Sequence, residues 1–274
     1  MHDTTATDQA TTPDGGTATA GGSDPPAHER HGARAAVYAA LAAVFQFPEE
    51  SVVAELTAPE TDAGLAAAGE TLGLAPEVDA LREALAAADG ETLRATHMDL
   101  FGLPGDDGEY PVVPYEANYT VREDIGQQQR RIAKVAGAVE ALGFEFDDDF
   151  DERHDHVAVE LELLQVLAGW RAVAAESGDE ENDAELARIE AMLLADHLVD
   201  FVPSLATALT AATEHDVYAS AAMLAKALVT RDHARHADVD RPAPERAGAA
   251  ASDDTDAEPG DTTDAAASAD GGDP

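Results

Sequence analysis

The side chains best suited to chemistry lie in one short segment, His154-Asp155-His156, with Glu160 one helical turn further on. Residues four apart share a helix face, so His156 and Glu160 would point in the same direction. Histidine and carboxylate side chains bind divalent metals, whereas a carboxylate near a helix start accepts free backbone N–H groups. The segment therefore has three interpretations: a metal site, a helix cap, or part of a recognition site.

Other catalytic patterns are missing from the sequence. A dinuclear carboxylate bundle needs Glu-x-x-His on each of two helices, and that tetrad does not occur; the nearest match is Asp151-x-x-His154. There is no glycine-rich phosphate loop and no nucleophile elbow. The chain has no cysteine, which excludes disulfides, thiolate metal sites and cysteine nucleophiles. We therefore expect a protein that is not an enzyme and that holds no resident metal or cofactor.

The charge of the chain restricts its partners. The formal net charge is −40, from 56 acidic and 16 basic residues. Such a surface repels phosphate backbones and anionic lipids, so nucleic acid is not an expected partner. Acidic residues occur in nearly every segment, which favours adaptation to a high-salt cytoplasm over one functional acidic block. No apolar run approaches the ~18 residues that span a bilayer, and the N-terminus lacks the pattern of a secretory signal. We expect a cytoplasmic protein without stable membrane insertion.

The two ends of the chain differ from its middle. Residues 1–27 and 238–274 are rich in Asp, Ala, Thr, Gly and Pro and contain almost no large apolar side chain. Such segments cannot bury enough surface to offset chain entropy, so we expect two disordered acidic tails. Residues 28–237 remain, enough for a single substantial core.

The middle of the chain predicts an all-α bundle, because Ala and Leu dominate and apolar residues recur at spacings of three and four. Asp89 is expected to cap one helix, Gly143 to end another, and Thr120 and Glu123 to form a capping box. Ile125 and Trp170 are expected to face inward, and His97 and His197 to be hydrogen-bonded packing residues. The expected helices cover about 29–46, 49–57, 62–72, 76 onward, 90–100, 120–142, 152–176, 183–201, 203 onward and 215–235.

Residues 101–119 interrupt the helical pattern with three prolines and three glycines, yet they carry three tyrosines, a phenylalanine and two adjacent valines. A loop of this length within a compact domain is usually functional or disordered. Because an aromatic-rich loop gains by burial, we expect this one to pack back on the bundle and form part of a surface.

Three blocks of sequence resemble a known family. The first is LFGLPG at 100–105 followed by PYEANY at 114–119, the second is DHVAVELELL at 155–164, and the third is HLVDFVP at 197–203 with VYA at 217–219. In this order they are similar to the TorD/DmsD/NarJ family of chaperones for molybdoenzymes of the dimethyl sulfoxide reductase type. The likeness spans roughly residues 31–233.

The resemblance implies a helical chaperone that binds the twin-arginine signal segment of a molybdopterin oxidoreductase subunit and holds the subunit for cofactor insertion. His97 stands where some relatives have tryptophan, three residues before the Leu-Phe pair. We expect an open apolar groove edged with carboxylates that pair with the arginines of the peptide. Its expected residues are His97, Leu100, Phe101, Pro114, Tyr115, Glu116, Tyr119, Asp155, His156 and Glu160.

Two other functions are compatible with the residues. One is a helical-bundle protein that binds a metal or ligand through His154, Asp155, His156 and Glu160. The other is a helical adaptor or oligomerisation module that uses the 101–119 loop as a packing arm. The sequence leaves open which reductase is the client, whether the protein is a monomer or a dimer, and whether it contacts a cofactor or nucleotide directly.

Overall fold

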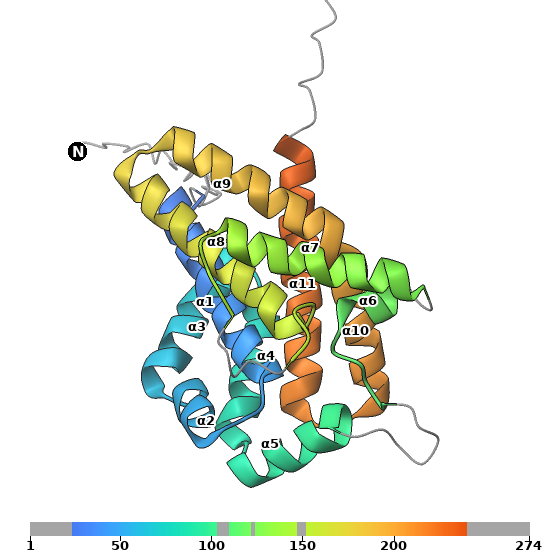
Figure 1. Ribbon diagram of the computed structural model, residues 1–274. Coiled ribbons are helices and arrows are strands. Elements are labelled where there is room, and N and C mark those ends of the chain that lie inside the picture. Colours follow the sequence, from blue (N-terminus) through green and yellow to red (C-terminus); the bar gives the residue numbers. More distant parts are fainter. Residues whose placement is uncertain (1–23, 103–109, 122–123, 147–151, 240–274) are drawn as a thin grey trace, which may run out of the picture. The chain divides into compact units, whose positions relative to one another are not determined.

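The computed structural model describes residues 24–102, 110–121, 124–146 and 152–239, and these form helices without any strand (Figure 1). The predicted all-α fold is confirmed. The tails predicted at 1–27 and 238–274 fall almost entirely outside the described residues. The helices, with η marking π-helical segments, are α1 (Ala27–Phe45), α2 (Glu50–Leu56), α3 (Pro59–Leu72), α4 (Ala75–Ala87), α5 (Gly90–His97), η1 (Met98–Gly102), α6 (Glu116–Thr120), α7 (Ile125–Ala141), α8 (Val157–Ser177), α9 (Glu180–Leu193), η2 (Leu194–Leu198), α10 (Val199–Ala212) and α11 (Asp216–Val239).

The core forms around the pairing of α1 with α8, the most extensive helix contact in the described chain. Both helices are rich in Ala, Val and Leu, and their contacts bury Leu41, Leu161 and Leu164 completely. On one side α3 packs against α1 and α4, while α11 packs against both α4 and α10 (Figure 1). Burial of these apolar faces is the main force that holds the bundle together.

Several predicted helix ends are confirmed. The side chain of Asp89 accepts hydrogen bonds from the backbone N–H groups of Glu91 and Thr92, at 3.1 and 2.9 Å, and so caps α5. Gly143 follows α7 with a φ of 82°, a left-handed conformation that glycine adopts without steric cost.

The predicted start of α7 is wrong. Thr120 is the last residue of α6, where its hydroxyl donates to the Glu116 carbonyl at 3.2 Å, and Glu123 lies outside the described residues. Helix α7 begins at Ile125 because Asp124 caps it by accepting a hydrogen bond from the Gln127 N–H at 2.9 Å. Asp124, directly before the helix, is therefore its N-cap in place of the predicted Thr120.

Two residues expected in the core lie on the surface. Ile125 is 70% exposed, since it is the first residue of α7 and precedes the buried positions of that helix. Trp170 is 38% exposed and stacks on Phe144, with 5.8 Å between the ring centroids. The apolar positions of a helix thus need not all face one core.

The π-helical segment η2 joins α9 to α10 in one continuous helical run, where the sequence predicted two helices separated before Pro203. Pro203 lies inside α10, as its fifth residue. Within the described chain this helical run, Glu180–Ala212, is long enough to cross a membrane, and its most apolar window of 18 residues has a mean hydropathy of 1.3. From the sequence we expected no apolar run of about 18 residues. Half of this window is buried within the protein, and a core helix of a globular domain has the same length and composition.

Candidate functional site

Two of the sequence blocks singled out above lie side by side. The N–H of Glu116 donates to the carbonyl of Asp155, and the N–H of Val157 donates to the carbonyl of Pro114, both at 2.9 Å. Between them Tyr115 and His156 form an isolated antiparallel bridge. The loop is thereby fixed to the start of α8, as expected for a segment that packs back on the bundle, and the N–H of Val112 bonds the carbonyl of Leu100 at 3.1 Å.

Asp155 caps a helix, but not the one that follows it. Its buried carboxylate accepts a hydrogen bond from the N–H of Ala117, at the start of α6, at 2.9 Å. Arg153 donates to the same carboxylate through Nε at 3.0 Å and Nη2 at 2.7 Å. Helix α8 is capped instead by His156, whose Nδ1 accepts from the N–H of Ala158 at 3.1 Å. Burial lowers the pKa of His156 to about 4, so the ring is neutral near pH 7.

A second buried carboxylate, Glu116, joins three elements. His197, in η2, lies with its Nδ1 2.9 Å from Glu116 Oε2, and Arg131, in α7, lies with its Nε 3.1 Å from Glu116 Oε1. The prediction that His197 is a hydrogen-bonded packing residue is confirmed. Both partners were missed as members of this site, because they lie 15 and 81 residues from Glu116 in helices whose pattern is otherwise ordinary.

The third carboxylate, Glu160, is fully buried, and neither of its oxygens has a hydrogen-bond partner among the described residues. Burial raises the pKa of Glu160 well above its usual range, and the negative charges of Glu116 and Asp155 raise it further, whereas Arg131 opposes them. Such a carboxyl group either stays protonated or needs a cation.

The residues of the described chain that could hold a metal ion are Glu116, Glu160 and His197, each of which offers one ligand atom within 4.8 Å of the others. The set proposed from the sequence does not converge in this way. His154 stacks on Phe146 with 3.9 Å between the ring centroids, Asp155 is bonded to Arg153, and Nδ1 of His156 caps α8. The alternative of a metal site built from His154, Asp155, His156 and Glu160 is therefore not supported by their geometry, and of these four residues only Glu160 belongs to the cluster that the described residues form.

A group of aromatic rings packs around His97 and Phe101, two of the residues expected in the site. His97 lies between Phe47 and Phe101, with ring-centroid distances of 5.5 and 5.0 Å, and Phe101 packs on Tyr218 at 6.1 Å. Burial lowers the pKa of His97, so it acts here as a neutral aromatic ring. Phe47 and Met98 remain 46% and 45% exposed. We call Phe47, His97, Met98 and Phe101 the aromatic face.

The residues expected to line an open groove are largely covered by the rest of the described chain. Six of these ten residues are buried and four are half-buried, and none of them lines any of four cavities in the described chain. The carboxylates expected at its edge, Glu116, Asp155 and Glu160, lie inside the protein. Arg153, Arg131 and His197 supply the partners that burial of Asp155 and Glu116 requires, whereas Glu160 has none among the described residues. The buried residues are Leu100, Pro114, Glu116, Asp155, His156 and Glu160; the half-buried ones are His97, Phe101, Tyr115 and Tyr119.

Comparison with known proteins places these residues in a family. No curated protein matches the sequence significantly. The structure is similar to that of a redox enzyme maturation protein from Archaeoglobus fulgidus, with 17% identity and a TM-score of 0.44 over 72% of this chain and 93% of that one. The sequence matches the profile of the nitrate reductase delta subunit over residues 71–207, half of its 274 residues and every residue of the site described above except Phe47 and Tyr218. As the three sequence blocks predicted, the chain belongs to the nitrate reductase delta subunit family of NarJ/TorD-type chaperones.

Proposed function

We propose that this protein binds the N-terminal, twin-arginine signal segment of a molybdopterin oxidoreductase catalytic subunit and holds the subunit in the cytoplasm for cofactor insertion. Membership of the chaperone family carries this proposal. The protein acts by binding and not by catalysis, as a monomer or a dimer. The client is the catalytic subunit of a molybdoenzyme.

The aromatic face is the surface best suited to the apolar part of such a segment. In this face the rings of His97 and Phe101 pack together and are half-buried, whereas the side chains of Phe47 and Met98 beside them are well exposed. A partner helix or extended chain that covers Phe47 and Met98 removes apolar surface from water without disturbing the core. Methionine adapts to differently shaped apolar partners because its chain is unbranched and flexible.

The buried carboxylates support this surface indirectly. Asp155 and Arg153 fix the 114–119 segment to the start of α8, and Glu116 ties the same segment to α7 and η2. Tyr119, from that segment, packs on Phe201 of α10 with 5.3 Å between the ring centroids. Glu116 and Asp155 thus hold the 114–119 segment in place, and because Glu116, Asp155 and Glu160 are all buried, none of the three is assigned to contact with the peptide.

The arginines of the peptide would pair with carboxylates that water reaches. Asp99 is exposed next to Met98, and Glu152 is exposed while it accepts a hydrogen bond from the Tyr115 hydroxyl at 2.6 Å. In concentrated salt the screening length falls to ~3 Å, so the overall charge of the chain contributes little at longer range. Short-range pairing and apolar burial must therefore provide the affinity.

The test measures binding of a labelled signal-segment peptide from a molybdoenzyme of the same genome, by fluorescence anisotropy in high salt. Phe47→Ser and Met98→Ser should each weaken binding by about 1 kcal/mol, or roughly fivefold, because each loses part of an apolar contact. Met192→Ser is the matched control, since Met192 is 59% exposed on α9, away from the aromatic face. Equal affinity in all three variants and the unchanged protein would refute the proposed surface.

A further inference from the structure

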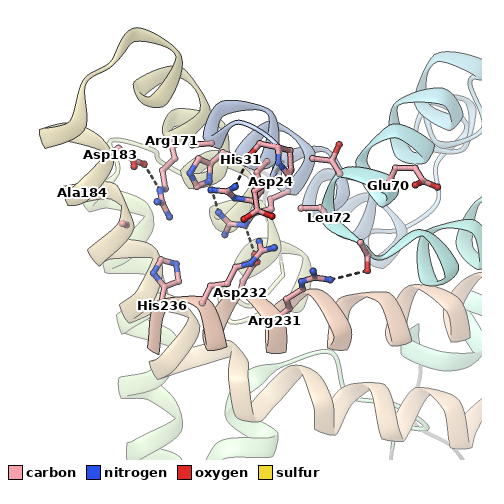
Figure 2. Close-up of a pocket in the computed structure, with 18 residues that line it drawn as sticks. Asp24, His31, Glu70, Leu72, Arg171, Asp183, Ala184, Arg231, Asp232 and His236 are labelled. Carbon is pink, nitrogen blue, oxygen red and sulfur yellow. Dashed lines mark hydrogen bonds and ion pairs between the residues drawn. The ribbon is translucent and has the colours of Figure 1, made fainter. Parts of the chain in front are cut away.

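A separate cavity of about 810 Å³ opens between the start of α1, the turn from α3 to α4, the end of α8, α9 and the last turns of α11. Figure 2 shows side chains from these elements directed toward one hollow, with His31 and Arg171 on one side and Arg231 and His236 on the other. None of its lining residues belongs to the site described above. Its volume is in the range of pockets that hold a small molecule.

The lining of this cavity is unusually basic for such an acidic protein. Five of the 16 basic residues of the chain line it, together with two histidines, although the net charge of the chain is −40. Four acidic residues, Asp24, Glu70, Asp183 and Asp232, line the cavity as well, so the lining is rich in arginine but not free of negative charge. The basic residues are Arg30, His31, Arg34, Arg171, Arg231, Arg235 and His236.

Two of the arginines are neutralised within the protein and form the base of the cavity. Arg34 pairs with Asp232 at 2.6 Å and with Glu190. Arg171 donates to Asp183 and to Glu190, both at 2.7 Å. Glu190 and Asp232 are buried, so this network holds α1, α8, α9 and α11 together and its charges are balanced in place.

The arginines of the wall are not neutralised in this way. Arg30 donates to the carbonyl of Pro25 at 2.9 Å, and Arg231 donates to the carbonyl of Gly73 at 3.1 Å. Within the described residues neither is within ion-pair distance of a carboxylate, and that includes the exposed Asp24 and Glu70 at the rim. Among the described residues, two positive charges therefore line the cavity without a carboxylate within ion-pair distance.

Arg235 adds a third, weakly paired guanidinium. It lies 3.5 Å from Asp232, a carboxylate that already pairs with Arg34. Burial lowers the pKa of Arg235, and the nearby Arg231, Arg34 and Arg30 lower it further, whereas Asp232 raises it, so Arg235 lies close enough to the other guanidinium groups to feel their charge. Burial, with help from Arg171, Arg34 and Arg30, also lowers the pKa of His31 to about 3, so His31 stays neutral.

We propose that this cavity binds a phosphorylated small molecule, with the phosphate oxygens accepting hydrogen bonds from Arg30, Arg231 and Arg235. The planar guanidinium group matches the geometry of phosphate oxygens and remains charged at any physiological pH. A phosphate placed there would pair with the guanidinium groups of Arg30 and Arg231, which have no carboxylate within ion-pair distance among the described residues, while the remaining volume of the cavity accommodates the organic part of the ligand. This proposal is independent of peptide binding, because the cavity and the aromatic face share no residue.

The experiment is isothermal titration calorimetry with pyrophosphate as the probe, on the full-length protein at fixed KCl concentration. The unchanged protein should bind pyrophosphate, and the double variant R30Q/R231Q should bind it about tenfold or more weakly, because it loses charge-assisted hydrogen bonds. Arg188→Gln is the matched control, since Arg188 is exposed on α9 and does not line the cavity. The buried Arg34 and Arg171 are left in place so that the fold is retained.

Helical content measured by circular dichroism checks the folding of each variant, and the single variant Arg231→Gln decides the question if the double variant does not fold. Absence of pyrophosphate binding to the unchanged protein overturns the proposal. Equal affinity in the unchanged protein, the arginine variants and the Arg188→Gln control overturns it as well, because binding would then occur elsewhere.

Discussion

Replacing Glu160 with glutamine should make the protein more stable near neutral pH. Glu160 is fully buried, its oxygens have no hydrogen-bond partner in the described chain, and its nearest charges include Glu116 and Asp155. The pKa of Glu160 is therefore raised in the folded state, whereas in the unfolded chain it is near 4.5. Glutamine has almost the same shape without the charge, so the variant avoids the cost of protonating or burying the carboxylate.

The sign of the pH dependence follows from this raised pKa. Well below pH 4.5 the carboxyl group is protonated in both states, so the pH-dependent difference in stability between the two proteins should vanish. As pH rises, the unfolded chain loses this proton first, and the folded protein with Glu160 loses ~1.4 kcal/mol of stability per pH unit until its own pKa is reached. At pH 8 we expect the Glu160→Gln variant to be more stable by about 1–3 kcal/mol.

Urea unfolding at several pH values and constant KCl measures this difference, and titrations common to both proteins cancel in it. Glu185→Gln, at an exposed position of α9, should change stability by less than about 0.5 kcal/mol at every pH. A Glu160→Gln variant that is less stable at pH 8, or a difference that does not vary with pH, would show that Glu160 is ionised and compensated. If a chelator then destabilised only the unchanged protein, the cluster of Glu116, Glu160 and His197 would be a metal site.

Two further predictions concern single contacts. Arg153→Ala should destabilise the protein by about 3 kcal/mol in urea unfolding, because it leaves the Asp155 carboxylate buried without its cation. The control Arg188→Ala should have almost no effect. A small effect of Arg153→Ala would mean that the hydrogen bond from the Ala117 N–H is enough to stabilise the buried carboxylate. Gly178→Ala should cost about 1 kcal/mol because its φ is +73°, and Gly169→Ala, inside α8, should stabilise by about 0.5–1 kcal/mol. Neither added methyl group meets another atom within 4 Å, so both effects should come from the backbone conformation alone. The thermal unfolding midpoint should fall for Gly178→Ala and rise for Gly169→Ala, and a shift of both in the same direction would contradict this explanation.

Local features of the chain were readable from the sequence because they depend on near neighbours. The spacing of apolar residues predicted the helices, and Asp89 and Gly143 predicted two helix ends. The order of the three sequence blocks predicted the family. One error was also local: the helix predicted from Thr120 starts at Ile125 because Asp124, one residue before it, caps the helix there.

The site itself depended on distant pairings that no local pattern specifies. Glu116 is paired with His197 across 81 residues, and the ion pair of Arg34 with Asp232 in the basic cavity spans 198. The sequence alone determined the helical fold, the family and the acidic surface, since composition and periodicity are properties of neighbouring residues. Only the tertiary structure decided which charged groups are buried, paired or left facing a cavity, because packing of separate helices fixes how much water each group retains.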